Sequence, residues 1–464
     1  MGGTPHVRHV TDAEIRLLVS GRLEDQLEER RRIVRHLLSA CPDCLPKITP
    51  YASLLDDDEE VAISAMPVFD DEAAYDGILE RSLAAAVRRE AEARHERAWR
   101  DRFLADVRSR GLIGFDAIVD AISDEMPARA RLESLLALSF EARYRNPREM
   151  LLLARGAQVV AISLGKEPDR DLYSPAEVAD LRAQAWAELA NAYRVCEDIE
   201  AAASALAQAF AAREDGSDDR CLLARLLDVQ ASLLTDQRRL DEAVHLLDTV
   251  HDIYLQVGES HLAGRALVSK GISIHYDGRP AEAVGVLRKG LGLLDSQRDP
   301  QLLATGHQAL LDAMAANGEY SAAKRLLFES GLRHVFAADP LNLLKLDWLE
   351  GRILAGLHKL PQAERVLAVV QGGFHDAGLD YEASLVALER AGVLLQQGQA
   401  AEVEALAEEA LETFLLLDIG HEAVHAVRYL QEAVRQRVAT AGLVRQVLDF
   451  LQRLERRPYL RFTP

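Results

Sequence analysis

The sequence predicts an all-α protein, an α-solenoid of stacked helical hairpins preceded by a small N-terminal helical module. Apolar residues make up 49% of the 464 residues but aromatic residues only 5%, a composition that favours packed helices over sandwiches and barrels. One helical pattern recurs about every 40 residues between positions 175 and 456. No apolar run is long enough to cross a bilayer, so no membrane span is expected.

Charge and cysteine content narrow the classes of function. Asp and Glu outnumber Lys and Arg by 74 to 54, and a surface with a net charge of −20 repels nucleic-acid phosphates. Four cysteines are too few for a disulfide scaffold, and the N-terminus lacks the apolar segment of a secretion signal. We therefore expect a cytoplasmic protein that binds neither nucleic acid directly nor a membrane.

Residues 1–45 predict a helical module with one zinc site. Thr11–Glu14 has the pattern of a capping box at the start of a short helix, and a charged helix is expected from about 24 to 39. Two cysteines then follow at the spacing of tetrahedral zinc sites, one histidine precedes them by about one helical turn, and an upstream histidine could complete the set. The predicted ligands are His36, Cys41, Cys44 and His9, with His6 as the alternative to His9.

This segment resembles the zinc-binding anti-sigma domain, which has a glycine turn, a charged helix and an HL signature before CxxC. The matching positions are Gly21, Leu23, His36, Leu37, Cys41 and Cys44. The resemblance covers this segment alone and implies a structural zinc ion, a regulatory role and a sigma factor as partner. The alternative is a pair of ordinary cysteines near a helix end, in a module that only caps the repeats.

The next two regions lead into the repeats. Residues 46–74 contain prolines and acidic runs at Asp56–Glu60 and Asp70–Glu72, which predict an acidic linker. Within 75–174 we expect a long amphipathic helix over 75–110 and a degenerate hairpin of helices at 128–143 and 145–160. Pro147 stands in that hairpin where the later repeats have Pro280.

One helix type then recurs six times. Each copy has a small or β-branched residue at a fixed position and mostly apolar residues four and seven positions later, on the same helix face. The fixed position is occupied by Ala202, Ala243, Ala283, Ala323, Ala363 and Val403, at spacings of 41, 40, 40, 40 and 40. Another helix precedes each copy, with turns near 197, 238, 278, 318, 358 and 398. A single hairpin cannot bury both faces, so the hairpins must stack.

The repeats resemble the tetratricopeptide repeat (TPR) family. In the best unit, the family pattern is matched by Trp186, Leu189, Ala190, Tyr193, Ala202, Leu206 and Ala209. The period of 40 exceeds the family's 34, and the extra residues fall between repeats. The resemblance covers about 175–456, within an array expected over 175–457 that ends in a charged capping helix. It implies a TPR-like solenoid with a groove for a protein or peptide partner.

By analogy with that family, the second, fifth, ninth and twelfth residues of each unit line the groove. These positions include Gln184, Asn191, Arg194, Arg225, Asp228, Arg265, His275, Gln308, Asp312, Lys345, Trp348 and Arg352. Lys and Arg outnumber Asp in this set although the chain is acidic, so we expect an acidic partner. The alternative is that these residues are ordinary soluble surface.

Only one motif suggests catalysis. His421–His425 reads HEAVH and fits the HExxH helix of zinc proteases, but no histidine follows it as a third ligand, and its helix is in register with the preceding repeats. Phosphate-binding loops and the nucleophile elbow of hydrolases do not occur. We therefore predict a non-enzymatic interaction scaffold with an N-terminal zinc module. A bare adaptor without metal is the alternative, and a zinc metallopeptidase is less favoured.

Overall fold

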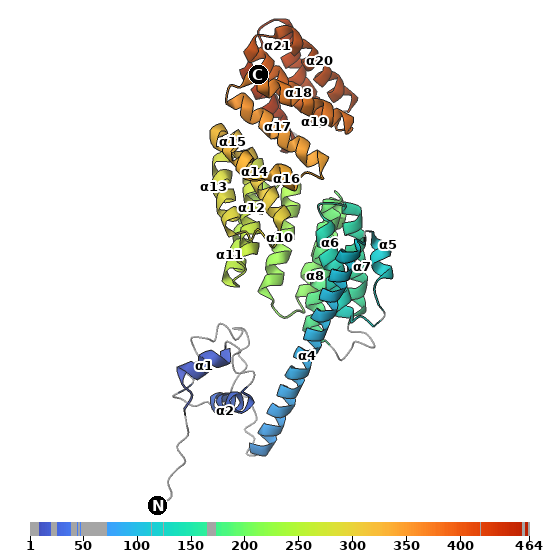
Figure 1. Ribbon diagram of the computed structural model, residues 1–464, viewed down its shortest axis with the longest axis vertical. Coiled ribbons are helices and arrows are strands. Elements are labelled where there is room, and N and C mark those ends of the chain that lie inside the picture. The colour runs from blue at the N-terminus through green and yellow to red at the C-terminus, as the bar shows by residue number, and fades with distance from the viewer. Residues whose placement is uncertain are drawn as a thin grey trace, which may run out of the picture. The chain divides into compact units, whose positions relative to one another are not determined.

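The computed structural model describes residues 9–19, 26–38, 44, 47, 72–112, 114–123, 125–164, 173–417, 419–456 and 460–462. The chain forms two compact units, Met1–Ala91 and Glu92–Pro464. Every regular element in the described ranges is an α-helix, which confirms the predicted fold class (Figure 1). No helix among these residues is both long enough and apolar enough to span a membrane.

In the N-terminal unit, α1 (Asp12–Val19) begins with the predicted capping box. The Thr11 backbone N–H donates to Glu14 Oε2 at 2.7 Å, and the Glu14 N–H donates to Thr11 Oγ1 at 3.3 Å. Glu14 also accepts from Arg32 at 2.6 Å, which ties α1 to α2 (Leu27–Leu38). Ile15 and Ile33 are fully buried. Most of the predicted acidic linker, 46–74, lies outside the described residues.

The long helix predicted at 75–110 is α4 (Glu72–Arg110), and the short α5 (Phe115–Asp120) follows it. The degenerate hairpin is also confirmed, as α6 (Ala128–Ala142) and α7 (Pro147–Ser163). Asn146 caps α7 by accepting from the Glu149 N–H, and Pro147 fits the first turn because its missing N–H would have no partner there.

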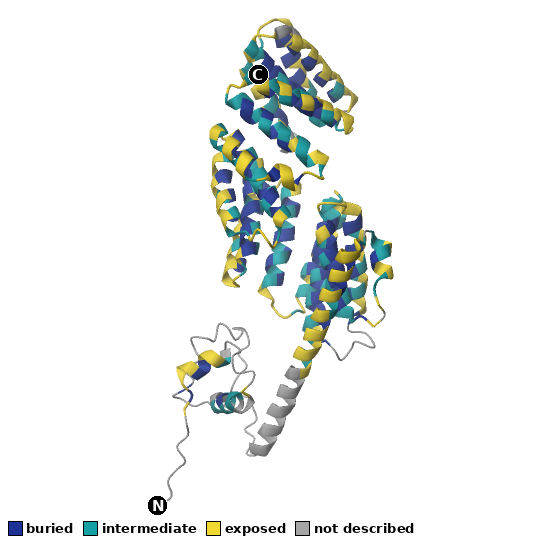
Figure 2. Cartoon of the chain, in the orientation of Figure 1, coloured by how far each residue is buried: buried dark blue, intermediate teal, exposed yellow. Residues whose placement is uncertain are grey.

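Seven hairpins follow, and consecutive helices pack side by side, as Figure 1 shows. Their helices are α8 (Pro175–Val195) and α9 (Ile199–Arg213), α10 (Arg220–Asp236) and α11 (Leu240–Gln256), α12 (Ser260–Tyr276) and α13 (Pro280–Leu293), α14 (Pro300–Ala316) and α15 (Tyr320–Glu329), α17 (Pro340–Gly356) and α18 (Leu360–Asp376), α19 (Asp380–Gln397) and α20 (Ala400–Leu416), and α21 (His421–Arg435) and α22 (Ala441–Arg456). Buried faces turn towards neighbouring helices, as Figure 2 shows.

All six predicted turns occur, and each contains one residue in the left-handed conformation. These residues are Glu197, Arg238, Gly278, Gly318, His358 and Gly398, with φ between 57° and 81°. At the third turn, the Gly278 and Arg279 N–H groups donate to His275 O and Ile274 O. Three of the six residues are not glycine, so the stacking register places the turn even where the side chain disfavours it.

In the second helix of each of the first six hairpins, the residue at the fixed small position, from Ala202 to Val403, is at most 1% exposed, as the register predicted. The fourth hairpin departs from the pattern further along its second helix. There α15 ends at Glu329, Gly331 takes a left-handed φ of 65°, and the short α16 (Leu332–Val335) follows. Leu327, which the register placed in the core, is only half-buried, and Leu332 and Phe336 fill the core instead.

Candidate functional site

The first helices of the hairpins, α8, α10, α12, α14, α17 and α19, share one face, which we call the first-helix face. It is hollowed in three places. A cavity of about 300 Å³ lies beside Gln184 and Arg225, and one of about 610 Å³ beside Arg194 and Asp236. A third, of about 500 Å³, lies beside Arg352. The predicted groove residues belong to this face.

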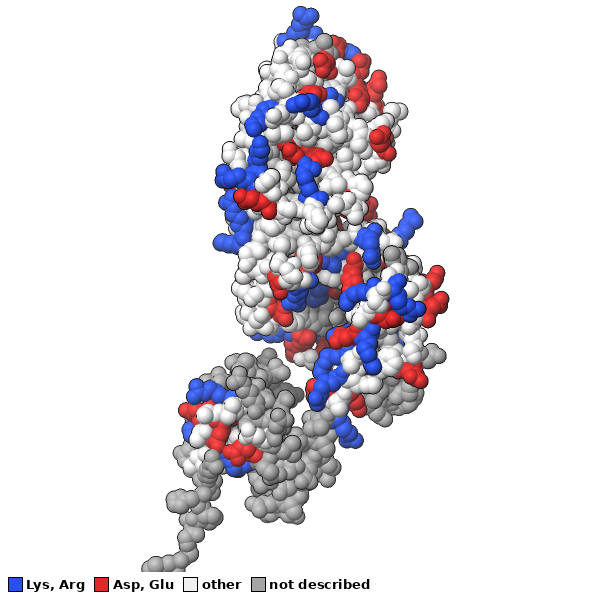
Figure 3. Space-filling model, viewed as in Figure 1, with Lys and Arg blue, Asp and Glu red and all other residues white. Residues whose placement is uncertain are grey.

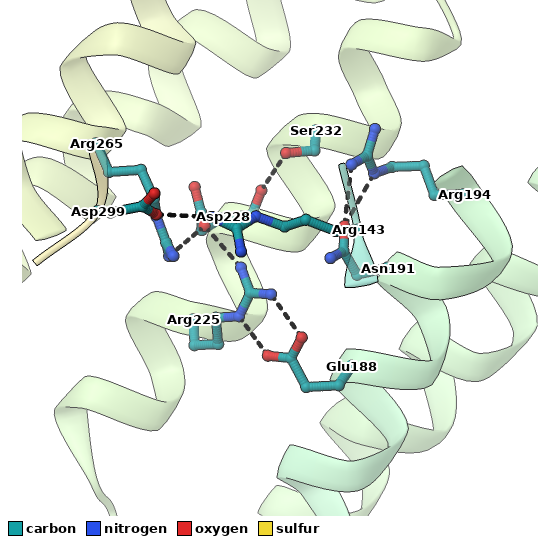
Figure 4. Close-up of polar contacts among 9 residues, drawn as sticks. All are labelled: Arg143, Glu188, Asn191, Arg194, Arg225, Asp228, Ser232, Arg265 and Asp299. Atoms are coloured by element: carbon teal, nitrogen blue, oxygen red, sulfur yellow. Dashed lines mark hydrogen bonds and ion pairs between the residues drawn. The ribbon is translucent and has the colours of Figure 1, made fainter. Parts of the chain in front are cut away.

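A front network joins α8, α10 and α12 (Figure 4). Arg225 of α10 donates to both carboxylate oxygens of Glu188 on α8, Nε to Oε1 at 2.6 Å and Nη2 to Oε2 at 2.7 Å. Asp228 Oδ2 accepts from Arg225 Nη1 at 2.9 Å and from Arg265 Nη2 of α12 at 2.7 Å. Each interface between these three helices is therefore crossed by an ion pair.

The side chains of the front network are largely buried. The Asp228 side chain is 6% exposed and the Arg225 side chain 17%. Burial alone would lower the pKa of Arg225, but Glu188 and Asp228 raise it above its usual range. Burial also raises the pKa of the neighbouring Tyr254 to about 12. These side chains are fixed in place before any partner arrives.

Beside this network, Asn191 Oδ1 accepts from Arg194 Nε at 3.2 Å and Nη2 at 3.0 Å. Arg194 Nη1 donates to Asp236 Oδ2 at 2.9 Å, a second link between α8 and α10. Figure 4 shows Asn191 and Arg194 on the helix that carries Glu188. Arg194 is thus positioned by two acceptors.

A rear network continues across α12, α14, α17 and α19. His275 Nε2 lies 3.0 Å from Asp312 Oδ2, and Arg352 Nη1 donates to Asp312 Oδ1 at 2.6 Å. Trp348 Nε1 donates to Glu389 Oε2 at 2.8 Å. Burial would raise the pKa of Asp312, but Arg352 and His275 hold it well below its usual range. Burial raises the pKa of Glu389 despite Arg352.

The excess of positive charge on this face is smaller than the sequence-based count indicated. That count left out Glu188 and Glu389, which stacking brings beside Arg225 and Arg352. On the side of the molecule drawn in Figure 3, Lys and Arg lie beside Asp and Glu over the repeat helices. Both missed carboxylates occupy the sixth position of their units, outside the positions taken from the TPR analogy. The sequence did contain a signal for Glu188: an acidic residue lies 37 positions before a basic residue of the next repeat, as with Glu188 and Arg225.

The remaining predicted groove residues differ in role. Gln184 lines the 300 Å³ cavity, and Gln308 is half-buried. Lys345 is exposed, and neither Gln308 nor Lys345 makes a hydrogen bond or ion pair within the described ranges. These two positions therefore reach solvent on the same face without a structural partner.

One contact links distant hairpins. Arg143, at the end of α6, donates from Nη2 to Asp299 Oδ2 at 2.6 Å, and both side chains are about 15% exposed. Figure 4 draws this pair in the same view as the front network. Asp299 also caps α14 by accepting from the Leu302 N–H. Because the two side chains come from distant parts of the sequence, the contact connects the degenerate hairpin directly to the fourth repeat.

In the N-terminal unit, three of the predicted zinc ligands converge. Cys44 Sγ lies 3.3 Å from His36 Nε2 and 3.6 Å from His9 Nδ1. These two distances fit ligands of one tetrahedral ion with bonds of about 2.0–2.3 Å, and one donor atom from each of the three residues lies within 4.8 Å of the other two. Cys41 and His6 lie outside the described residues. α2 ends at Leu38, two residues after His36.

The HEAVH residues gather no comparable group. His421 and His425 are exposed on α21, and Glu422 Oε2 accepts from the Phe462 N–H at 3.0 Å. In the described part of the chain, the group of His9, His36 and Cys44 is the one cluster of three or more metal-binding side chains. Glu422 therefore fixes the C-terminal backbone here.

No family model and no curated protein matches the sequence. Among solved structures, the Rap protein complexed with competence and sporulation factor is similar at a TM-score of 0.52 and 7% identity, over 71% of this chain and 88% of that one. The apo form of RapI has a TM-score of 0.44 at 13% identity, over 62% and 99%. Aspartyl phosphate phosphatase F from Bacillus subtilis has 0.45 at 10%, over 89% and 95%. The first likeness, at this identity, concerns the fold, and it agrees with the TPR-like stacking of helical hairpins.

Proposed function

We propose that this chain is a non-enzymatic interaction scaffold whose first-helix face binds an extended segment of a partner protein or a peptide. The observation that carries the proposal is the series of polar contacts that crosses every interface from α8 to α19 beside three hollows. Stacked hairpins present extended surfaces of this kind. Side chains already fixed by ion pairs lose little entropy when a partner binds.

The fold likeness adds support by analogy. The Rap protein of similar fold was found in a complex with competence and sporulation factor, and binding is the role we carry over. The acidic partner expected from the sequence stays a prediction, and the proposal does not depend on it, because carboxylates pair with Arg225, Arg265 and Arg352. Hydrogen bonds to a mixed polar surface would contribute to recognition whatever the net charge of the partner.

Site-specific crosslinking tests this proposal. A photoreactive p-benzoylphenylalanine in place of Gln308 should crosslink a defined segment, whereas the same probe in place of Val369, exposed on α18, should not. A synthetic copy of that segment should then bind the purified chain, and Lys345→Glu should change its affinity without changing the melting temperature. Equal crosslinking from both positions, or an affinity insensitive to Lys345→Glu, would contradict a site on the first-helix face.

We also propose that the N-terminal unit binds one structural zinc ion. The convergence of His9, His36 and Cys44 favours it, and Cys41 would be the fourth ligand. These residues would hold the ion and fix the ends of α1 and α2 against Cys44. The anti-sigma resemblance would then make a sigma factor the partner of this unit.

Metal analysis of the full chain separates the alternatives. We expect one zinc per chain, lost in Cys41→Ser/Cys44→Ser and retained in the matched control Cys196→Ser/Cys221→Ser. Zinc lost on changing His421 and His425 instead would favour the metallopeptidase, and no zinc in any variant would favour a bare adaptor. Co-purification with a co-expressed sigma factor that depends on Cys44 would test the partner.

A further inference from the structure

The C-terminal helix lies over part of the first-helix face. α22 packs against α19 as well as α21. Gly392 of α19 occupies the register position that Arg352 and Asp312 hold in the two preceding repeats, so it faces the groove as they do. A Cβ added to Gly392 would lie 3.3 Å from Val444 Cγ1 of α22. At this end, a helix of the chain itself therefore covers the groove.

The space beneath α22 is not filled. The 500 Å³ cavity is bounded by α22 on one side and by α14, α17 and α19 on the other. Its floor includes Ala315 and Ala355, whose register position holds Arg194, Thr235 and His275 in earlier repeats. Small residues thus hollow the face where α22 covers it. The volume lies in the range of small-ligand pockets, about 300–1,000 Å³.

One half-buried carboxylate in the cavity, that of Glu389, has one oxygen to which no hydrogen bond is donated. Glu389 Oε2 accepts from Trp348, but Glu389 Oε1 lies 3.6 Å from Arg352 Nε, beyond hydrogen-bonding distance. Arg352 directs its short bond to Asp312 instead, at 2.6 Å. Within the described ranges no hydrogen bond reaches Glu389 Oε1, although the side chain is only 15% exposed. Glu389 Oε1 therefore remains open, within the cavity, to a ligand that donates a hydrogen bond.

The cavity mouth carries a second carboxylate. Asp449 of α22 is exposed, lines the cavity, and makes no hydrogen bond or ion pair within the described residues. Arg445, one turn earlier on α22, also lines it. Because Arg352 directs its short bond to Asp312, Glu389 Oε1 is left as an acceptor for a positive donor inside the cavity.

We propose that the cavity beneath α22 binds a guanidinium or primary ammonium group, which donates a hydrogen bond to Glu389 Oε1. The aliphatic stem of such a group would lie against Ala315, Ala355 and Leu448. The cation could belong to a free small molecule or to a side chain of a bound peptide. The site stands apart from the proposed function, because a free cation could occupy it without any partner in the groove.

Trp348 provides the readout, because its indole N–H donates to the same carboxylate. The chain is labelled with 5-fluorotryptophan, and Trp348→Phe assigns the signal. Acetyl-arginine amide should shift the Trp348 ¹⁹F signal saturably in the millimolar range, and the neutral isostere acetyl-citrulline amide should bind at least about tenfold more weakly. Glu389→Gln should abolish the response, and Glu412→Gln, an exposed glutamate on α20, should leave it unchanged.

Two further arms complete the test. Ala355→Met should block binding by filling the cavity, which covers the case that Glu389→Gln does not fold. The pentapeptide acetyl-Ala-Ala-Arg-Ala-Ala-amide should bind at least about tenfold more tightly than acetyl-arginine amide if the cation is peptide-borne, and more weakly if a free cation is the ligand. Equal binding of citrulline and arginine derivatives, or no saturable shift with any probe, would overturn the proposal. Failure of crosslinking from position 308 would leave it intact.

Discussion

Between α8 and α12, two carboxylates face two arginines, whereas between α12 and α19 two carboxylates share one. In the front network, Glu188 and Asp228 each accept short bonds from Arg225, and Arg265 adds another. In the rear network, Arg352 lies 2.6 Å from Asp312 and only 3.6 Å from Glu389. The same repeat register has therefore produced one network in which every carboxylate is bonded to an arginine and one in which Glu389 lies too far from Arg352 for a hydrogen bond.

The difference teaches that register fixes position but not electrostatic balance. The front network braces three helices, and each of its carboxylates accepts two hydrogen bonds from arginines, so its role is structural. The rear network leaves a donor missing where the face is hollowed by small residues. Polar residues in a repeat groove are therefore best judged by their counter-ions and hydrogen bonds, not by their position in the unit.

The largest expected effect compares the two arginines. Arg225→Met leaves Glu188 and Asp228 short of donors in a buried site and should lower the free energy of unfolding by about 3–5 kcal/mol. Arg352→Met should cost less, because Asp312 keeps His275 and the already raised pKa lets Glu389 take up a proton. Urea denaturation of both variants tests this, and equal losses would remove the distinction between the networks.

Packing at the helix that the networks share gives the next effect. A Cβ on Gly290 of α13 would lie 3.0 Å from the Gly264 carbonyl oxygen of α12, so Gly290→Ala should destabilise by about 1–3 kcal/mol. Gly285→Ala, on the same helix with open space around it, should stabilise by up to about 1 kcal/mol. Thermal unfolding measures both changes. Equal melting temperatures would mean that α12 and α13 are less closely packed than the distances imply.

Acid titration separates the two carboxylates of the rear network. The pKa of Glu389 in the folded chain is raised above 4.5, its value in the unfolded chain. The folded chain therefore holds this proton to a higher pH than the unfolded chain, and stability should fall as pH rises from 4.5 through the raised pKa. The pKa of Asp312 is lowered from 3.8, so its contribution is present above 3.8 and is lost as pH falls through the folded value. When the unfolding midpoint is plotted against pH, Glu389→Gln should remove the fall in stability above pH 4.5, and Asp312→Asn should remove the loss of stability in acid below pH 3.8. A shared loss would mean that the pair titrates as one unit.

The smallest effect concerns the contact beside the front network. Asp299→Asn keeps a side chain that can cap α14 but removes the charge that pairs with Arg143, so we expect a loss of about 1 kcal/mol. A double-mutant cycle with Arg143→Gln isolates the pair from the cap. A coupling energy near zero would show that the degenerate hairpin and the fourth repeat are independent.

Much of the candidate site was predictable because it follows the register. The sequence placed Arg225, Asp228, Arg265 and Arg352 on one face, and the structure joins all four in ion pairs. The sequence also predicted that His9, His36 and Cys44 lie close together, because a CxxC pair after a histidine on a helix favours a compact set of ligands, and the structure groups these three residues. Glu188 and Glu389 were missed because the predicted face was taken from the second, fifth, ninth and twelfth positions of each unit, and both residues stand at the sixth.

What the sequence determined by itself is the repeat: its regular spacing, the six turns, and the small residues that let second helices approach. These are local patterns, and each is fixed by helix geometry within one hairpin. The tertiary structure alone decided which charges meet, since Glu188 and Arg225 are 37 positions apart and Arg143 and Asp299 are 156 apart. It also decided that α22 covers the groove at Gly392. Such contacts depend on how far each hairpin is rotated relative to the next. These small rotations add up along the stack, so the final position of a distant side chain cannot be deduced from the sequence of one hairpin.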